Sequence, residues 1–260
     1  MSLVAQQVDA VLQGVSVLNS ISVSFERNRF YGIIGPNGVG KSTLLHILSG
    51  SDAPSAGGVT LDGVPLSHMP GKILARKLAV LQQGGLPPVG FTVREVVAMG
   101  RYPHQNWLGG EGEDPEAIID EAIHTMELAE LQSRKLHQLS GGERQRVALA
   151  KLMAQQPEIL LLDEPTTYLD IGYQIELLDT VKAWQKQRSL LVVAVLHDLN
   201  LASLYCDKLI ALHRGGIAAE GTPDEVLNPA VIERLYGAKT TLVKHPATGV
   251  PQLILQPGES

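Results

Sequence analysis

Alternation of apolar and polar residues predicts β-structure in the first quarter of the chain. Residues 20–25 alternate serine with isoleucine, valine and phenylalanine, which predicts a strand with one exposed face. The apolar run Phe30–Ile34 follows a polar turn and predicts a buried strand. A helical pattern begins at Leu44 and stops at Gly50, and residues 59–66 predict two short strands around an Asp-Gly turn. Together these segments predict a small antiparallel sheet in the N-terminal part of the protein.

Three later apolar runs predict core strands, at residues 78–81, 159–162 and 190–196. The run at 159–162 is apolar on both faces, which is typical of a central strand in a parallel sheet covered by helices. Helical segments separate these runs along the chain, so the pattern favours an α/β fold.

Capping signals predict where three helices begin in the middle of the chain. Thr92 stands three residues before Glu95, the spacing of a capping box. Ser140 stands in the same relation to Glu143. Asp114 precedes a proline at a first helical position, which is the third helix start.

The C-terminal part repeats these signals. Thr222 and Glu225 have capping-box spacing, and Gly237 is placed to end the following helix. Two apolar segments flank a turn within residues 238–260 and predict a β-hairpin. No catalytic role is assigned to this part.

Two stretches interrupt the regular elements. Residues 84–90 contain glycines and prolines and predict a loop. Residues 101–107 are basic and aromatic, and we expect them to be exposed, either as a docking surface or as an ordinary loop.

Composition narrows the class of protein. A chain of 260 residues is long enough for one large domain with subdomains. Its 21 basic and 27 acidic side chains give a formal charge of −6, so there is no overall electrostatic case for binding nucleic acid. The single cysteine, Cys206, is predicted to be a buried filler and fits a reducing compartment. The N-terminal residues lack the pattern of a secretion signal, and no apolar run approaches the roughly 20 residues that span a bilayer. Any membrane role would therefore come through a partner.

The candidate chemistry begins at GPNGVGKST, residues 35–43, which matches the phosphate-loop pattern G-x-x-x-x-G-K-[ST] at every fixed position. Backbone N–H groups and a helix N-terminus bind the anion, Lys41 reaches the β- and γ-phosphates, and Ser42 offers a hydroxyl to magnesium. A glycine-rich turn that only joins a strand to a helix would not explain Lys41 and Ser42. The predicted phosphate-binding residues are Gly35, Pro36, Asn37, Gly38, Val39, Gly40, Lys41, Ser42 and Thr43.

A second predicted anion site lies at the start of the helix after Ser140. Gly141 and Gly142 are costly in a helix, and their presence is explained if backbone N–H groups approach a ligand closely.

Polar residues follow the predicted core strands. Asp163 suits magnesium, directly or through a bound water, and Glu164 is placed to polarise the water that attacks the γ-phosphate. The plain alternative is a pair of surface acids after a strand. His197 follows another strand at the same sheet edge, where a γ-phosphate contact is favoured over a structural role. Gln83 also ends a strand, either as a contact to a metal or water or as a solvated strand end.

The order of five motifs along the chain resembles that in the nucleotide-binding subunits of ABC transporters. These motifs are the phosphate loop, LSGGERQR at 139–146, ILLLDEP at 159–165, Tyr168-Leu169-Asp170 and LHD at 196–198. The resemblance covers nearly the whole chain. It implies a phosphate-loop NTPase core with a mainly parallel sheet, an N-terminal antiparallel β subdomain, and a helical subdomain at about residues 86–155 that carries the signature motif.

The resemblance also implies roles for the motif residues. Gln83 is the Q-loop glutamine, Asp170 closes the D-loop, and His197 is the switch histidine. The implied catalytic residues are Lys41, Gln83, Glu164 and His197; the implied magnesium ligands are Ser42, Gln83 and Asp163; and Ser140, Gly141, Gly142 and Asp170 join the phosphate loop in binding ATP. Members of this family work as head-to-tail dimers that sandwich two ATP molecules, each phosphate loop facing the signature motif of the opposite chain.

Further segments, at residues 92–104, 196–202, 205–207 and 236–255, resemble the ATPases of importers for ferric siderophores, haem and cobalamin. This resemblance implies a polytopic membrane permease as partner, a periplasmic or surface substrate-binding protein that acts through the permease, and a peripheral location on the cytoplasmic face of a bacterial inner or plasma membrane. Residues from Gln83 to about Trp107 would transmit motion to the permease. Where the family commonly places an aromatic residue against adenine, this chain has Leu12, Val15 and Val17.

Three rival classes are weighed against this interpretation. A soluble ABC ATPase not coupled to transport would share the nucleotide machinery, but its DNA-repair members carry long coiled-coil or zinc-bearing insertions that the sequence lacks. A scaffold without turnover should have lost part of the set Lys41, Asp163, Glu164 and His197, and all four are present. A regulatory GTPase is disfavoured because proteins of that class do not contain the LSGGERQR signature.

Overall fold

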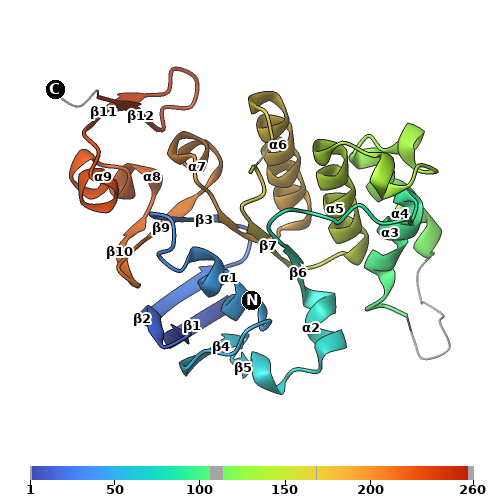
Figure 1. The fold of residues 1–260 in the computed structure, drawn as a ribbon, viewed down its shortest axis with the longest axis horizontal. Helices are drawn as coiled ribbons and strands as arrows, with labels where there is room; N and C mark the ends of the chain where they lie inside the picture. The colour runs from blue at the N-terminus through green and yellow to red at the C-terminus, as the bar shows by residue number, and fades with distance from the viewer. Residues whose placement is uncertain (1, 106–113, 168, 257–260) are drawn as a thin grey trace. The chain divides into compact units, whose positions relative to one another are not determined.

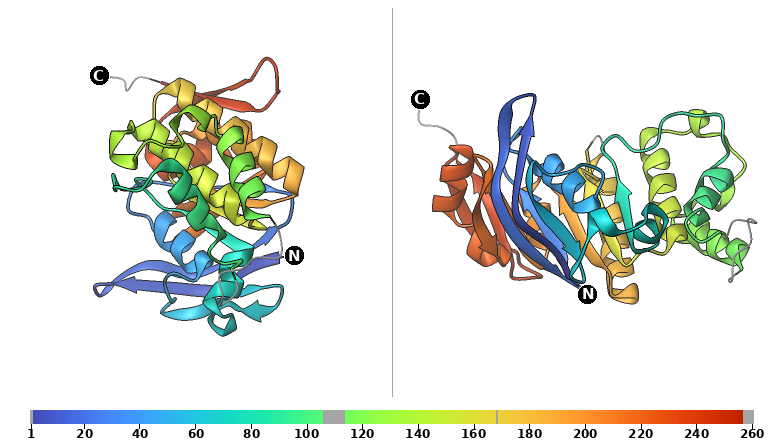
Figure 2. Two further views of the ribbon diagram at one scale, coloured as in Figure 1. Left: turned by 90° about the vertical axis from the view of Figure 1, so that its right-hand side faces the viewer. Right: turned by 90° about the horizontal axis from the view of Figure 1, so that it is seen from below.

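The computed structural model describes residues 2–105, 114–167 and 169–256. The chain divides into two units, one formed by residues 1–68 with 182–260 and the other by residues 69–181. Figure 1 shows the elements of both units, and Figure 2 shows them from two further directions.

The first unit contains an antiparallel sheet with the strand order β2-β1-β4-β5. β1 (Ser2–Leu12) pairs with β2 (Val15–Glu26) and with β4 (Ala56–Leu61), and β5 (Val64–Pro65) pairs with β4. The predicted alternation in β2 is confirmed, since its apolar side chains Ile21, Val23 and Phe25 are buried and the serines between them are exposed. The short helix η1 (Leu66–His68) follows β5.

A second, mainly parallel set of strands in this unit surrounds β3 (Phe30–Ile34). β3 pairs in parallel with β8 (Leu191–Val195) and β9 (Lys208–His213), while β10 (Gly216–Gly221) is antiparallel to β9. Every residue of β3 and β8 is buried, as apolar strands covered on both faces require. Helix α1 (Lys41–Ser49) follows β3 and ends at Gly50, which has the φ of +74° that favours glycine at a helix C-terminus.

The C-terminal elements of the first unit are α7 (Leu199–Tyr205), α8 (Pro223–Val226), α9 (Pro229–Tyr236), β11 (Thr240–Lys244) and β12 (Pro251–Leu255). β11 and β12 pair antiparallel. Asn200 of α7 joins this hairpin to the rest of the unit, because its side chain accepts a 2.7 Å hydrogen bond from the Leu253 N–H and donates to the Leu253 carbonyl at 3.2 Å. The predicted caps at Thr222 and Gly237 are confirmed.

The second unit combines a parallel strand pair with helices. β6 (Leu78–Leu81) pairs with β7 (Ile159–Asp163), and α2 (Gly71–Lys77) precedes β6. The helices are α3 (Val93–Ala98), η2 (Met99–Arg101), α4 (Pro115–Thr125), η3 (Ala129–Leu131), η4 (Leu136–Gln138) and α5 (Gly141–Gln155). Helix α6 (Ile171–Arg188) begins here and contains the boundary with the first unit. Buried apolar residues on α3, α4 and α5 pack together.

The helix starts of the second unit follow the sequence signals. Thr92 and Ser140 each form a complete capping box, and the Asp114 side chain accepts a hydrogen bond from the Glu116 N–H at 3.1 Å. Parallel pairing of β6 with β7 and of β3 with its neighbours confirms the predicted α/β class with a mainly parallel sheet and an N-terminal antiparallel sheet.

The expected exposure of residues 101–107 is wrong at Arg101 and at Pro103, which are both buried. The Arg101 side chain is 2% exposed, and its guanidinium donates 2.7 Å hydrogen bonds to the Ala154 carbonyl and to the Gln156 side chain. Tyr102, the next residue, is 70% exposed. Ala154 of α5 and Gln156 just after this helix supply acceptors for the Arg101 guanidinium, so Arg101 is buried although its neighbours in the sequence predict an exposed side chain. The part of this stretch from Asn106 to Trp107 lies outside the described residues.

Candidate nucleotide-binding and catalytic site

The phosphate loop lies between β3 and α1 and depends on its glycines. Gly35, Gly38 and Gly40 have φ angles of +147°, +75° and +104°. A Cβ added at Gly35 would lie 2.4 Å from the Leu212 carbonyl oxygen, and one at Gly40 would lie 2.7 Å from a methyl group of Leu18. Close approach of β9 and β2 therefore leaves room only for glycine at these two positions.

Lys41 is the first residue of α1 and is 5% exposed. Its ammonium group donates hydrogen bonds to the carbonyl oxygens of Gly35 and Pro36, both at 2.9 Å. The ammonium group is thus fixed across the loop, beside the N-terminal partial positive charge of α1. Ser42 and Thr43 follow in the first helical turn and are half-buried. Two glycines, an ordered ammonium group and a helix N-terminus fit a polyphosphate.

Tyr236, from α9, is a contact of the loop that the sequence did not predict. Burial raises the pKa of Tyr236 to about 12, and its hydroxyl makes a hydrogen bond with the main chain of Gly35, which acts in the opposite direction. Nothing in the local pattern connects two residues that are so far apart in the chain.

The second unit carries the two predicted carboxylates at the end of β7. Asp163 is the last residue of the strand and is 2% exposed. Glu164 has a φ of +49°, which is uncommon for a non-glycine residue and is costly unless the surroundings hold it. The Glu164 carboxylate accepts hydrogen bonds from the Gln83 side-chain amide at 2.7 Å and from the Thr167 hydroxyl at 3.2 Å. The structure therefore brings Gln83 and Glu164 together.

The signature residues begin helix α5. The Glu143 carboxylate accepts a 2.7 Å hydrogen bond from the Ser140 N–H, and the Ser140 hydroxyl accepts one from the Glu143 N–H at 3.3 Å. Hydrogen bonds from Ser140 lower the pKa of Glu143, and the bond from the Ser140 backbone is the larger cause. Ser140 and Gly141 are exposed, so the N-terminus of this helix is accessible to a ligand.

A cavity of about 230 Å³ joins these parts of the second unit. It is lined by Gly84, Gly85, Gly141, Arg144, Gln145, Glu164, Thr167 and Leu169. The loop after Gln83, the start of α5 and the Glu164 carboxylate thus share one space.

His197 and Asp170 both lie at exposed positions. His197 follows β8 in the first unit, and Asp170 precedes α6 in the second, where its carboxylate accepts a hydrogen bond from the Tyr173 N–H at 3.1 Å. Tyr168 lies outside the described residues. Among the described residues, no cluster of three or more His, Cys, Asp or Glu side chains is arranged to hold a metal ion, and no helix is long and apolar enough to cross a membrane.

Sequence reasoning also gave no role to three side chains of the second unit. Gln145 donates to the Pro165 carbonyl at 3.0 Å, Gln174 donates to the Leu169 carbonyl at 2.9 Å, and Thr167 contacts Glu164 as described above. Gln145 lies inside the signature motif, but a motif does not show which atoms its side chains bind.

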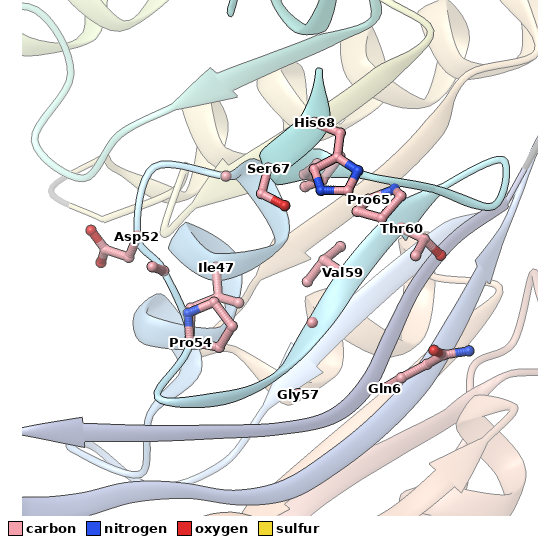
Figure 3. A pocket seen from close by; sticks show the side chains of 14 residues that line it. Gln6, Ile47, Asp52, Pro54, Gly57, Val59, Thr60, Pro65, Ser67 and His68 are labelled. Carbon is pink, nitrogen blue, oxygen red and sulfur yellow. The ribbon is translucent and has the colours of Figure 1, made fainter. Parts of the chain in front are cut away.

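A larger cavity, of about 510 Å³, lies in the first unit near the C-terminal end of α1 (Figure 3). Ile47, Pro54, Val59 and Pro65 form much of its apolar wall, and His68 lies at one side. None of the predicted site residues lines it, and the phosphate loop lies at the opposite end of the same helix. This cavity is therefore separate from the nucleotide site.

A family model described as ABC transporter matches residues 18–167. The chain is 40% identical to the ferric enterobactin transport ATP-binding protein FepC of Escherichia coli, over 92% of this chain and 88% of FepC. It is 38% identical to the probable siderophore transport system ATP-binding protein YusV of Bacillus subtilis, over 92% and 86%. The cobalamin import ATP-binding protein BtuD of Halobacterium salinarum is 38% identical, over 96% of this chain and 62% of BtuD.

Solved structures agree with these relatives. The dimeric structure of MJ0796, a bacterial ABC transporter cassette, is 27% identical and superposes with a TM-score of 0.75, covering 85% of this chain and 98% of that one. A dimeric post-hydrolysis state of MJ0796 bound to ADP and phosphate is 28% identical, with the same TM-score and coverage. The chain therefore belongs to the ABC transporter family, as an ATP-binding subunit that hydrolyses ATP.

Proposed function

We propose that this subunit powers the import of a metal chelate of the iron-siderophore, haem or cobalamin type through a membrane permease. The observation that carries the proposal is the 40% identity to FepC, a ferric enterobactin transport protein, over 92% of the chain. YusV and BtuD, whose names give siderophore transport and cobalamin import, support the same class of cargo.

In the first unit, the phosphate loop and Lys41 bind the phosphates of the substrate ATP. The ammonium group of Lys41 exchanges its carbonyl partners Gly35 and Pro36 for phosphate oxygens, and the N-terminus of α1 adds positive potential. His197 is the proposed contact to the γ-phosphate.

Magnesium is the metal that we propose to accompany ATP. Ser42 of the first unit offers a hydroxyl, and Gln83 and Asp163 of the second unit offer an amide and a carboxylate oxygen, all of them hard ligands of the kind that magnesium prefers. When bound, the ion neutralises charge on the phosphate groups during transfer.

In the second unit, Glu164 is the proposed general base. Its carboxylate accepts the proton of the attacking water, and Gln83 holds that carboxylate at 2.7 Å before the substrate is in place. Preorganisation of this kind removes the need to order the base during the reaction.

The proposed assembly is a head-to-tail dimer. Ser140, Gly141, Gly142 and Asp170 of one chain contact the ATP held by the phosphate loop of the other chain. The dimeric MJ0796 structures support the assembly of two copies. A helical subdomain of about residues 86–155 and the segment that starts at Gln83 transmit closure to the permease. A substrate-binding protein delivers cargo to the permease, and the dimer sits on the cytoplasmic face of the membrane as a peripheral subunit.

Co-purification tests this proposal. The tagged chain is extracted from its own membranes with detergent, and the proteins and small molecules that accompany it are identified by mass and absorbance. A polytopic permease, with a haem, corrinoid or ferric-chelate spectrum, is the expected result. Recovery only from the soluble fraction, without a membrane partner, would favour the alternative of a soluble ABC ATPase not coupled to transport.

A further inference from the structure

The turn that carries Glu164 is held by glutamine side chains from two helices. Gln145 of α5 donates to the Pro165 carbonyl at 3.0 Å. Gln174 of α6 donates to the Leu169 carbonyl at 2.9 Å and to the Thr166 carbonyl at 3.3 Å. Three main-chain carbonyls that follow Glu164 therefore receive side-chain amides.

These amides add to the main-chain bonds of the turn. Among its described residues, the Thr167 N–H donates to the Glu164 carbonyl at 3.2 Å, and the Leu169 N–H donates to the Thr166 carbonyl at 3.3 Å. The shortest side-chain bonds to the turn, from Gln174 to the Leu169 carbonyl at 2.9 Å and from Gln145 to the Pro165 carbonyl at 3.0 Å, lie in the usual range for N–H···O bonds. Glu164 itself is in the left-handed region, a conformation that persists only when its surroundings hold it.

Gln145 lies between this turn and the loop that follows Gln83. While its amide nitrogen binds the Pro165 carbonyl, its amide oxygen lies 2.6 Å from the position that a Cβ on Gly85 would occupy. Gln145 is four residues after Gly141, so it lies one helical turn from the N-terminus of α5. A shift at the start of the signature helix would therefore reach the Glu164 turn through one side chain.

We propose that Gln145 and Gln174 are positioning residues that fix the Glu164 carboxylate through the main chain of the turn after β7. This proposal rests on the proposed role of Glu164 as general base. Gln83 and Thr167 bind the carboxylate directly, whereas Gln145 and Gln174 fix the backbone that carries it.

The competing interpretation is that Gln145 only stabilises the fold. The chain offers a matched control in the same helix, because Gln155 donates to the main-chain carbonyls of Ala75 at 2.6 Å and Leu78 at 3.0 Å. Gln155 has the same chemistry as Gln145, but its acceptors lie outside the Glu164 turn. Gln155→Leu therefore removes comparable bonds without touching the proposed site.

The test compares Gln145→Leu, Gln174→Leu and Gln155→Leu in the full chain. We expect kcat for ATP to fall about 10- to 100-fold in the first two variants, since a misplaced catalytic group can cost that much. KM for ATP should stay within about twofold, because the phosphate loop is untouched. Gln155→Leu should keep kcat while lowering the thermal midpoint at least as much as Gln145→Leu. Equal losses of kcat in Gln145→Leu and Gln155→Leu would overturn the proposal.

A double variant tests whether Gln145 acts through Glu164. In single-turnover assays, adding Gln145→Leu to Glu164→Gln should cause no further loss, because residues that act as one unit are not additive. Losses that multiply would show that Gln145 acts elsewhere. If Glu164→Gln alone keeps normal turnover, the proposed general base is wrong and the positioning role falls with it. If Glu164→Gln is inactive and Gln145→Leu is normal, only the positioning role is wrong.

Discussion

At the scale of single residues, substitution of Lys41 gives the most direct test of ATP binding. Its ammonium group is almost fully buried and donates hydrogen bonds to the carbonyl oxygens of Gly35 and Pro36. A hydrogen bond from the same ammonium group to a charged phosphate oxygen is charge-assisted and therefore stronger than one to a neutral carbonyl. A hydrogen bond to a charged group contributes about 1.5–3 kcal/mol, so we expect Lys41→Ala to weaken ATP binding at least about 10-fold.

Equilibrium titration with a fluorescent ATP analogue measures this change. Lys186→Ala removes an exposed lysine from α6 and is the charge-matched control, which should bind normally. An unchanged dissociation constant for Lys41→Ala would show that Lys41 does not contribute to ATP binding.

At the scale of elements, capping boxes give α3 a measurable pH dependence. The Glu95 carboxylate accepts hydrogen bonds from the Thr92 N–H at 2.7 Å and from the Thr92 hydroxyl at 2.8 Å. The backbone bond is the larger cause of the lowered pKa of Glu95. Thr92→Ala should lower the free energy of unfolding at pH 7 by about 1 kcal/mol, the usual cost of losing such a cap.

The lowered pKa fixes the direction of the pH effect. The folded state favours ionised Glu95, so the contribution of Glu95 to the free energy of unfolding is fully present above the pKa of the unfolded chain, about 4.3. This contribution is lost as the pH falls from there through the lower pKa of the folded state. Urea unfolding across this range should show a steeper loss for the parent chain than for Glu95→Gln. If the free energy of unfolding falls with pH equally in both proteins, the Glu95 carboxylate is not the source of the pH dependence.

Close packing between η2 and α5 gives a second prediction at this scale. A Cβ on Gly100 would lie 2.2 Å from the Lys151 carbonyl oxygen, so α5 would have to move. We expect Gly100→Ala to lower the free energy of unfolding by about 1–3 kcal/mol, as overpacking does. Gly90 has no atom within 4 Å of its Cβ position and is the matched control. Chemical denaturation measures both variants, and equal midpoints would contradict the packing argument.

Elements with strong local signals were predictable, and those defined by distant contacts were not. The capping boxes at Thr92 and Ser140 and the apolar strand β7 follow from neighbouring residues alone. β1 was not predicted as a strand because its alternation is broken by register shifts between Ala5 and Val11. β10 is rich in glycine and alanine and is mostly half-buried, so its sequence carries little strand signal.

The candidate site shows the same division. The motif residues were predictable as residue types at fixed spacing, and Gln83 and Glu164 do meet. The contacts that hold them, such as Gln145 to the Pro165 carbonyl, depend on how α5 packs, which the local pattern does not give. Arg101 was misplaced for that reason, since its acceptors lie 53 and 55 residues further along the chain.

At the scale of the whole molecule, the accessible start of α5 fits the proposed head-to-tail dimer. Ser140 and Gly141 are exposed, and the cassette of MJ0796 is dimeric. We expect Glu164→Gln to bind ATP normally, to lose turnover by roughly 10²-fold or more, in line with loss of a general base, and to stay closed as a dimer.

Light scattering after size-exclusion chromatography tests the predicted dimer by measuring the molar mass. With ATP and magnesium, Glu164→Gln should elute with twice the 27.9 kDa mass of the chain, and without nucleotide it should shift towards the monomer. Lys41→Ala, combined with Glu164→Gln, is the control, because a chain that cannot hold the phosphates has nothing to present to the opposite signature helix. A dimer in that control would show that association does not depend on sandwiched nucleotide, and normal steady-state hydrolysis by Glu164→Gln would rule out its role as base.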